Sequence, residues 1–152
     1  MTEVRSYRDL VVWQRAMELA QAVYELTGTW PREEIYGLTS QVRRAAVSVP
    51  SNIAEGQGRA STKEFLNYLS IAYGSLMECE TQALLAERLS YLSAPAAAAL
   101  LERMAEVGRL LNGLVRALEH RQPSRRAPDR SLTTDHRPLT TDHRPLATDH
   151  SP

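Results

Sequence analysis

Side chains that could carry chemistry gather between Ser48 and Arg59, a stretch that reads S-V-P-S-N-I-A-E-G-Q-G-R. Glu55 falls in the last turn of a predicted helix, where the helix dipole disfavours a negative charge. Arg59 is the nearest compensating partner, and Asn52 lies one turn earlier. We interpret these three residues as a polar cluster that locks a loop. A contact to another subunit or a ligand is the first alternative, and catalysis is the second.

Two glycines follow Glu55. Gly56 and Gly58 flank Gln57, and we expect a turn that uses positive φ angles there. A glycine loop that leads into a helix can bind phosphate. The Walker pattern is absent, however, and no strand is predicted before the loop. We therefore interpret the glycines as a tight connection between two helices.

The sequence offers no set of residues for catalysis or metal binding. Glu78 and Glu80 are two residues apart on a predicted helix, so they point to different faces. Cys79 is the only cysteine, and no Glu-x-x-His occurs, which removes the ligands of a di-iron bundle. His120 stands alone at a predicted helix end. We expect no metal, no cofactor and no enzymatic activity.

Several arginines are candidates for phosphate contacts. Arg8 and Arg15 lie in the first predicted helix, and Arg43 and Arg44 are adjacent in the second. They would meet nucleic acid through its phosphates. A solvated helix face is the alternative interpretation.

Composition gives the general class of protein. The chain has 152 residues, 43% of them hydrophobic and 24% charged, which is typical of a soluble globular protein. Eighteen acids balance eighteen bases, so no global field favours nucleic acid or a membrane. No apolar run reaches the roughly 18 residues of a membrane span, and no signal-peptide region opens the chain. We expect a cytoplasmic location.

Hydrophobic spacing predicts four helices in residues 1–120. The first begins near Tyr7 or Arg8 and stops at Gly28. The second runs from about Leu38, kinks near Pro50 and ends at Gly56. The third follows a cap at Ser61, and the fourth follows a cap at Ser93. With no strand pattern and short links, the predicted fold is all-α, an antiparallel up-down-up-down four-helix bundle.

Two helices carry informative apolar patterns. The first has its expected core stripe at Leu10, Trp13, Met17, Ala20, Tyr24 and Leu26 or Thr27. The third alternates steps of four and three along a heptad seam: Phe65, Leu69, Ala72, Leu76, Cys79, Ala83 and Ala86. Other apolar residues of the third helix fall outside that seam, among them Ile71, Tyr73, Leu84 and Leu85. This helix is therefore expected to be buried on two sides, which a cyclic homo-oligomer would achieve.

Residues 121–152 have a different composition, rich in Pro, Arg, Ser, Thr and Asp. The heptapeptide T-T-D-H-R-P-L occurs at 133–139 and again at 140–146. Such a segment cannot bury enough apolar area to offset its ordering entropy. We predict a disordered, low-complexity C-terminal tail.

Four stretches resemble one known family: Tyr7 to Ala16, Trp30 to Ala46, Ser48 to Arg59, and Glu64 to Glu78. It is the four-helix bundle family of proteins encoded in intervening sequences of 23S ribosomal RNA genes, also called the S23 ribosomal protein family. The resemblance covers about Tyr7 to Leu118. The family's characteristic positions fall here on Gln41, Ser48, Asn52, Glu55, Gly56, Gly58 and Arg59.

The resemblance implies a bundle that assembles as a ring, commonly a pentamer, with no established enzymatic activity. A related bundle is the accessory protein of diversity-generating retroelements, which binds a reverse transcriptase and nucleic acid. That relative is strongly basic, whereas residues 1–120 here hold 12 bases and 14 acids. Our first hypothesis is a non-enzymatic, homo-oligomeric interaction module whose partner is RNA, DNA or another protein. The second is an RNA- or DNA-binding accessory protein, and an enzyme is the third.

Overall fold

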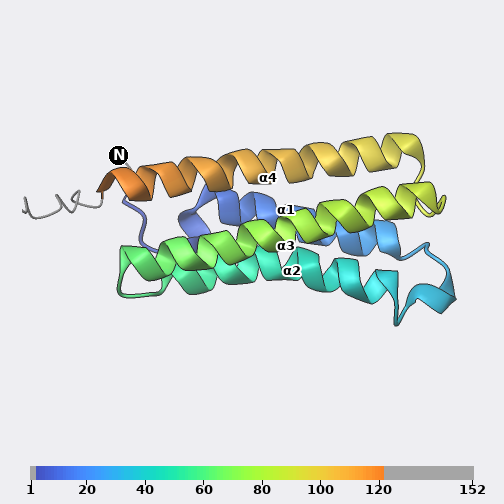
Figure 1. The fold of residues 1–152 in the computed structure, drawn as a ribbon, viewed down its shortest axis with the longest axis horizontal. Coiled ribbons are helices and arrows are strands. Elements are labelled where there is room, and N and C mark those ends of the chain that lie inside the picture. The colour runs from blue at the N-terminus through green and yellow to red at the C-terminus, as the bar shows by residue number, and fades with distance from the viewer. Residues whose placement is uncertain (1–2, 122–152) are drawn as a thin grey trace, which may run out of the picture.

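The computed structural model describes residues 3–121, which fold as four α-helices with no strand. They are α1 (Val11–Thr27), α2 (Leu38–Gln57), α3 (Thr62–Arg88) and α4 (Ala94–Arg121), with short 3-10 turns η1 (Tyr7–Asp9) and η2 (Arg32–Glu34). The helices lie side by side, and successive connections fall at alternate ends (Figure 1). The all-α prediction is confirmed. Arg121, the first residue of the predicted tail, is the last residue of α4, and the rest of that segment, from residue 122 on, lies outside the described residues.

Serine caps begin three of the helical segments. The Ser61 hydroxyl accepts the Glu64 backbone N–H, and the Ser93 hydroxyl accepts that of Ala96, as predicted. Ser6 forms a capping box with Asp9, but the segment it opens is only η1. Leu10 has extended backbone angles, so α1 begins at Val11 and the prediction of a continuous helix from Tyr7 is wrong.

The break before α1 is held by two contacts that fold η1 back onto the helix. The Tyr7 and Trp13 rings meet edge to face at 5.2 Å, and the Gln14 side chain donates a hydrogen bond to the Arg8 carbonyl. These contacts need Leu10 to be extended, which the local capping pattern does not reveal.

α2 runs through Pro50, whose ring is buried, and extends one residue beyond the predicted end at Gly56. Helical hydrogen bonds continue past Gly56, because the Gly58 N–H donates to the Ala54 carbonyl. The kink near Pro50 stays a prediction.

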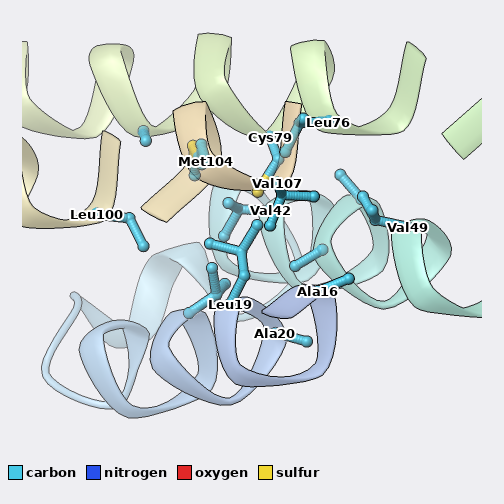
Figure 2. Packing of buried hydrophobic residues seen from close by; sticks show 14 of the residues in the cluster. Ala16, Leu19, Ala20, Val42, Val49, Leu76, Cys79, Leu100, Met104 and Val107 are labelled. Carbon is cyan, nitrogen blue, oxygen red and sulfur yellow. The ribbon is translucent and has the colours of Figure 1, made fainter. Parts of the chain in front are cut away.

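One hydrophobic core is shared by all four helices. Figure 2 shows Leu19 of α1, Val42 of α2, Leu76 and Cys79 of α3, and Met104 of α4 converging on it. The seam predicted for α3 is confirmed, since Leu69, Ala72, Leu76, Cys79, Ala83 and Ala86 are buried and Phe65 is half-buried.

The core stripe predicted for α1 is wrong in part. The buried residues of α1 are Val12, Ala16, Leu19, Ala20, Val23 and Thr27. Of the predicted stripe, Ala20 and Thr27 are buried and Leu10 and Trp13 pack half-buried against the core, but Met17 and Tyr24 are 45% and 48% exposed. α1 is apolar on two adjacent faces, and the face with the smaller side chains is the one that packs between its neighbours.

No helix in residues 3–121 combines the length and the apolar character that crossing a membrane requires.

Candidate functional site

Three polar contacts join α2 to α3 at intervals of one heptad. Gln41 meets Gln82 at 3.4 Å, Ser48 meets Ser75 at 2.8 Å, and Glu55 meets Tyr68 at 3.1 Å. The α2 position rises by seven at each step while the α3 position falls by seven, so the two helices are antiparallel in a fixed register. We call these six residues the polar ladder. Three of its members, Gln41, Ser48 and Glu55, are characteristic positions that the sequence resemblance singled out.

The Glu55–Tyr68 level of the ladder closes the connection between α2 and α3. The Arg59 guanidinium donates to the Glu55 carboxylate at 2.6 Å and to the Tyr68 hydroxyl at 2.6 Å, and its carbon lies 4.9 Å from the Tyr68 ring centre. The hydrogen bond that Arg59 donates to Glu55 is the main reason that the pKa of Arg59 is raised. The cluster is about half exposed, so it organises the loop more than it stabilises the fold.

Gly56 lies at a close approach between α2 and α3. A Cβ on Gly56 would sit 2.7 Å from the Tyr68 Cβ and 2.9 Å from a Phe65 ring carbon, closer than such atoms come. Neither Gly56 nor Gly58 has a positive φ, and the same holds for every glycine in residues 3–121. The predicted positive-φ turn is therefore wrong, and the requirement at Gly56 is steric.

Asn52 belongs to the middle level of the ladder. Its amide donates to the Ser48 carbonyl at 2.8 Å and to the Ser48 hydroxyl at 2.9 Å. The sequence grouped Asn52 with Glu55 and Arg59, but its hydrogen bonds run in the opposite direction along α2. Ser48 and Asn52 together with Ser75 form a half-buried polar layer between the helices.

The Gln41–Gln82 level contains a side-chain amide whose hydrogen bonds are long or missing. The Gln82 side chain is 8% exposed, and its nitrogen makes long hydrogen bonds to Gln41 (3.4 Å) and Glu78 (3.3 Å). Its oxygen has no partner within residues 3–121. Sequence analysis missed Tyr68, Ser75 and Gln82. Their mutual seven-residue spacing, matching that of Gln41, Ser48 and Glu55, was the available signal.

The four candidate arginines do not form one patch. Arg15 pairs with Glu18 and with Glu106 of α4, and the pKa of Arg15 is raised, mainly by Glu18. Arg43 donates to the Thr27 hydroxyl at 2.8 Å, beside the last turn of α1. At 1.5 Å of rise per residue, Arg15 and Thr27 are about 18 Å apart along α1. Arg8 lies over the Tyr7 ring, ahead of α1, and Arg44 is exposed.

A groove follows the line between α1 and α2. Its larger part has a volume of about 510 Å³ and is lined mainly by apolar side chains, including Trp13, Met17, Tyr24, Val47 and Pro50. A second part of about 380 Å³ shares Tyr24 and Val47 and adds Ile35, Thr39, Ser40, Arg43 and Arg44. We call both parts together the α1/α2 groove. Trp13, Met17, Ala20 and Tyr24, which the sequence had assigned to the core face of α1, line this groove.

Groups that could support metal or thiol chemistry are sparse. Within residues 3–121, no three His, Cys, Asp or Glu side chains gather as metal ligands would. Cys79 is buried, and burial, with a smaller effect from Glu78, raises the pKa of its thiol to about 12.

Comparison with known proteins identifies the family. A search of curated proteins found no match. The crystal structure of a protein of unknown function from the S23 ribosomal protein family of Bacteroides thetaiotaomicron VPI-5482 has a similar fold, with a TM-score of 0.63 and 23% identity over 69% of this chain and 98% of that one. The family model for 23S rRNA-intervening sequence proteins matches residues 8–113, which include the whole polar ladder. The chain therefore belongs to the 23S rRNA-intervening sequence protein family.

Proposed function

We propose that this protein is a non-enzymatic, cytoplasmic interaction module that works as a homo-oligomer. The observation that carries the proposal is the apolar surface left outside the core. Met17, Tyr24 and Val47 are between 41% and 48% exposed along the α1/α2 groove, and Ile71, Leu84 and Leu85 are between 43% and 47% exposed on α3. Exposed apolar patches of this kind mark sites of association.

The unit of assembly in this proposal is an up-down-up-down bundle. Connections at alternate ends of the bundle and the antiparallel pairing of α2 with α3 support this topology. A closed ring fits two apolar surfaces on different helices, because each subunit then offers one surface to each neighbour. The resemblance to the family favours a pentamer.

The second candidate function is RNA or DNA binding by an accessory protein. It is favoured by one feature, the exposed Arg44 beside Arg43 and Ser40 in the α1/α2 groove. A ring would repeat this basic site once per subunit and multiply its attraction for phosphates. The arginine of α1, Arg15, supports it less, because two carboxylates already neutralise its charge.

Size-exclusion chromatography with multi-angle light scattering tests both candidates. The full chain, purified with and without nuclease treatment, is run at low and at high salt. Self-association predicts one species free of nucleic acid with a mass that is a fixed multiple of the 17.0 kDa chain mass, five for a pentamer. The accessory-protein function predicts co-purifying nucleic acid that is released at high salt. A 17.0 kDa monomer at every concentration and salt would contradict the homo-oligomeric module.

A further inference from the structure

We propose that the α1/α2 groove of one subunit binds the outer face of α3 of a second copy of this chain. The inference rests on the proposed self-association and specifies which surfaces meet. The outer face consists of Ile71, Gly74, Glu78, Thr81 and Leu85, all of which are exposed. Their spacing of three and four residues places them in one line along α3, as in the seam of a coiled coil. We call this line the α3 ridge.

The kinds of side chain in the groove complement those on the ridge. In one part of the groove, Arg43 and Arg44 share the lining with the apolar Ile35 and Val47. On the ridge, Glu78 lies midway between Ile71 and Leu85. Arg44 forms no ion pair within residues 3–121, so its charge is available for a carboxylate from outside the subunit. A ridge seated in the groove would place acid against base and apolar side chains against apolar side chains.

Gly74 is a second feature of the ridge that the single chain does not explain. A Cβ added to Gly74 would meet nothing within 4 Å. Glycine inside a helix is less favourable than alanine, and no packing within the subunit requires it. Close approach of a helix from another subunit would require it, as the packing of α3 requires Gly56 inside the bundle.

Charge argues against a symmetric contact between two ridges. If two α3 helices packed antiparallel with Ile71 against Leu85, each Glu78 would lie opposite the Glu78 of the other copy. Like charges directly opposed in a partly buried seam destabilise the contact. The groove of one copy and the ridge of the next avoid this conflict, and such a head-to-tail contact can close into a ring.

Two single-face variants test the proposal. Met17→Glu places a carboxylate in the groove, and Leu85→Glu places one on the ridge. Both side chains are about half exposed in the single chain, so the helical fold is expected to persist and is checked by circular dichroism. Ala117→Glu makes the same change at an exposed position of α4 and serves as the control. We expect each face variant to be monomeric and the control to assemble as the wild type does.

Mixing the two variants gives the decisive measurement. Met17→Glu keeps an intact ridge and Leu85→Glu keeps an intact groove, so an equimolar mixture should form a species of two chains and no larger one. If both variants assemble like the wild type, the proposed surfaces are wrong although self-association stands. If one variant stays a homodimer and the mixture gives no mixed species, the interface is symmetric and the proposal is overturned. A monomeric wild type would contradict the self-association itself.

A pair of glycine variants provides an independent test. Gly74 and Gly113 both lie within helices, and neither has an atom within 4 Å of its added Cβ. Both Gly74→Ala and Gly113→Ala should favour helix and raise the thermal midpoint of the dissociated chain. Only Gly74→Ala should weaken assembly, by about tenfold or more in the dissociation constant. Equal assembly of the two variants would remove Gly74 from the interface and contradict the packing proposed for the ridge.

Discussion

Gly56 determines how closely α2 and α3 can pack. A methyl group there would overlap the Cβ of Tyr68 and the ring of Phe65, whereas one at Gly58 would make only ordinary contacts at 3.5 Å and beyond. We predict that Gly56→Ala lowers the free energy of unfolding by about 1–3 kcal/mol, the usual cost of overpacking. Gly58→Ala, two residues away, should change it by less than about 0.5 kcal/mol. Urea denaturation measures both, and equal effects would show that the spacing of α2 and α3 does not depend on Gly56.

Cys79 links stability to pH because its thiol stays protonated in the folded chain. Burial raises the pKa of Cys79 to about 12, above its ordinary value of about 9. Below pH 9 the thiol is neutral in both states and contributes no pH dependence. As the pH rises from 9 toward 12, the unfolded chain loses this proton first, so the free energy of unfolding falls.

The measurement for Cys79 is the slope of stability against pH, compared with Cys79→Ala. Between pH 9 and 10.5 the slope of the wild type should be steeper by up to about 1.4 kcal/mol per pH unit. Parallel curves would show that the folded chain releases the proton as easily as the unfolded one. The thiol should also react with a maleimide at pH 8 only after denaturation.

At the scale of the helices, the polar ladder specifies how α2 lies against α3. Polar contacts one heptad apart penalise a shifted register, because a slip of one turn would bury hydroxyl and amide groups without partners. The longer contacts at Gln82 and the unpaired oxygen of its amide show that the ladder contributes more to specificity than to stability.

A double-mutant cycle on Ser48 and Ser75 tests the ladder. Each single change to alanine leaves the other hydroxyl with one partner fewer, and Ser48→Ala also removes a hydrogen bond from Asn52. We expect each variant to lose about 0.5–1.5 kcal/mol of unfolding free energy. The double variant should lose less than the sum of the two single losses, by at least about 0.5 kcal/mol. Strict additivity in urea denaturation would mean that the two hydroxyls are not energetically coupled.

At the scale of the whole molecule, the core is complete within the described bundle. Its buried apolar residues run from Val12 to Leu111, and α4 ends at Arg121. Residues 122–152 are poor in apolar side chains. We predict that a chain ending at Arg121 keeps the thermal midpoint of the full chain within about 1 °C, because no apolar burial is lost. A fall of several degrees in calorimetry would show that the C-terminal segment contributes to the fold.

The number of helices and the caps of α3 and α4 could be predicted from the sequence because they depend on residues three or four positions apart. The heptad seam of α3 and the hydroxyl caps at Ser61 and Ser93 are local patterns of this kind, and the structure confirms them. The polar character of the stretch from Ser48 to Arg59 was also visible, although its hydrogen-bond partners on α3 were not.

Only the tertiary structure decided how these local elements share their surfaces. α1 offers two adjacent apolar faces, and periodicity cannot choose between them, because the choice depends on where α2 and α4 lie. Leu10 is extended because Trp13 meets Tyr7, and Gly56 is needed because α3 passes within contact distance. Each of these outcomes depends on residues brought together by packing, and a pattern read along one helix contains no information about its neighbours.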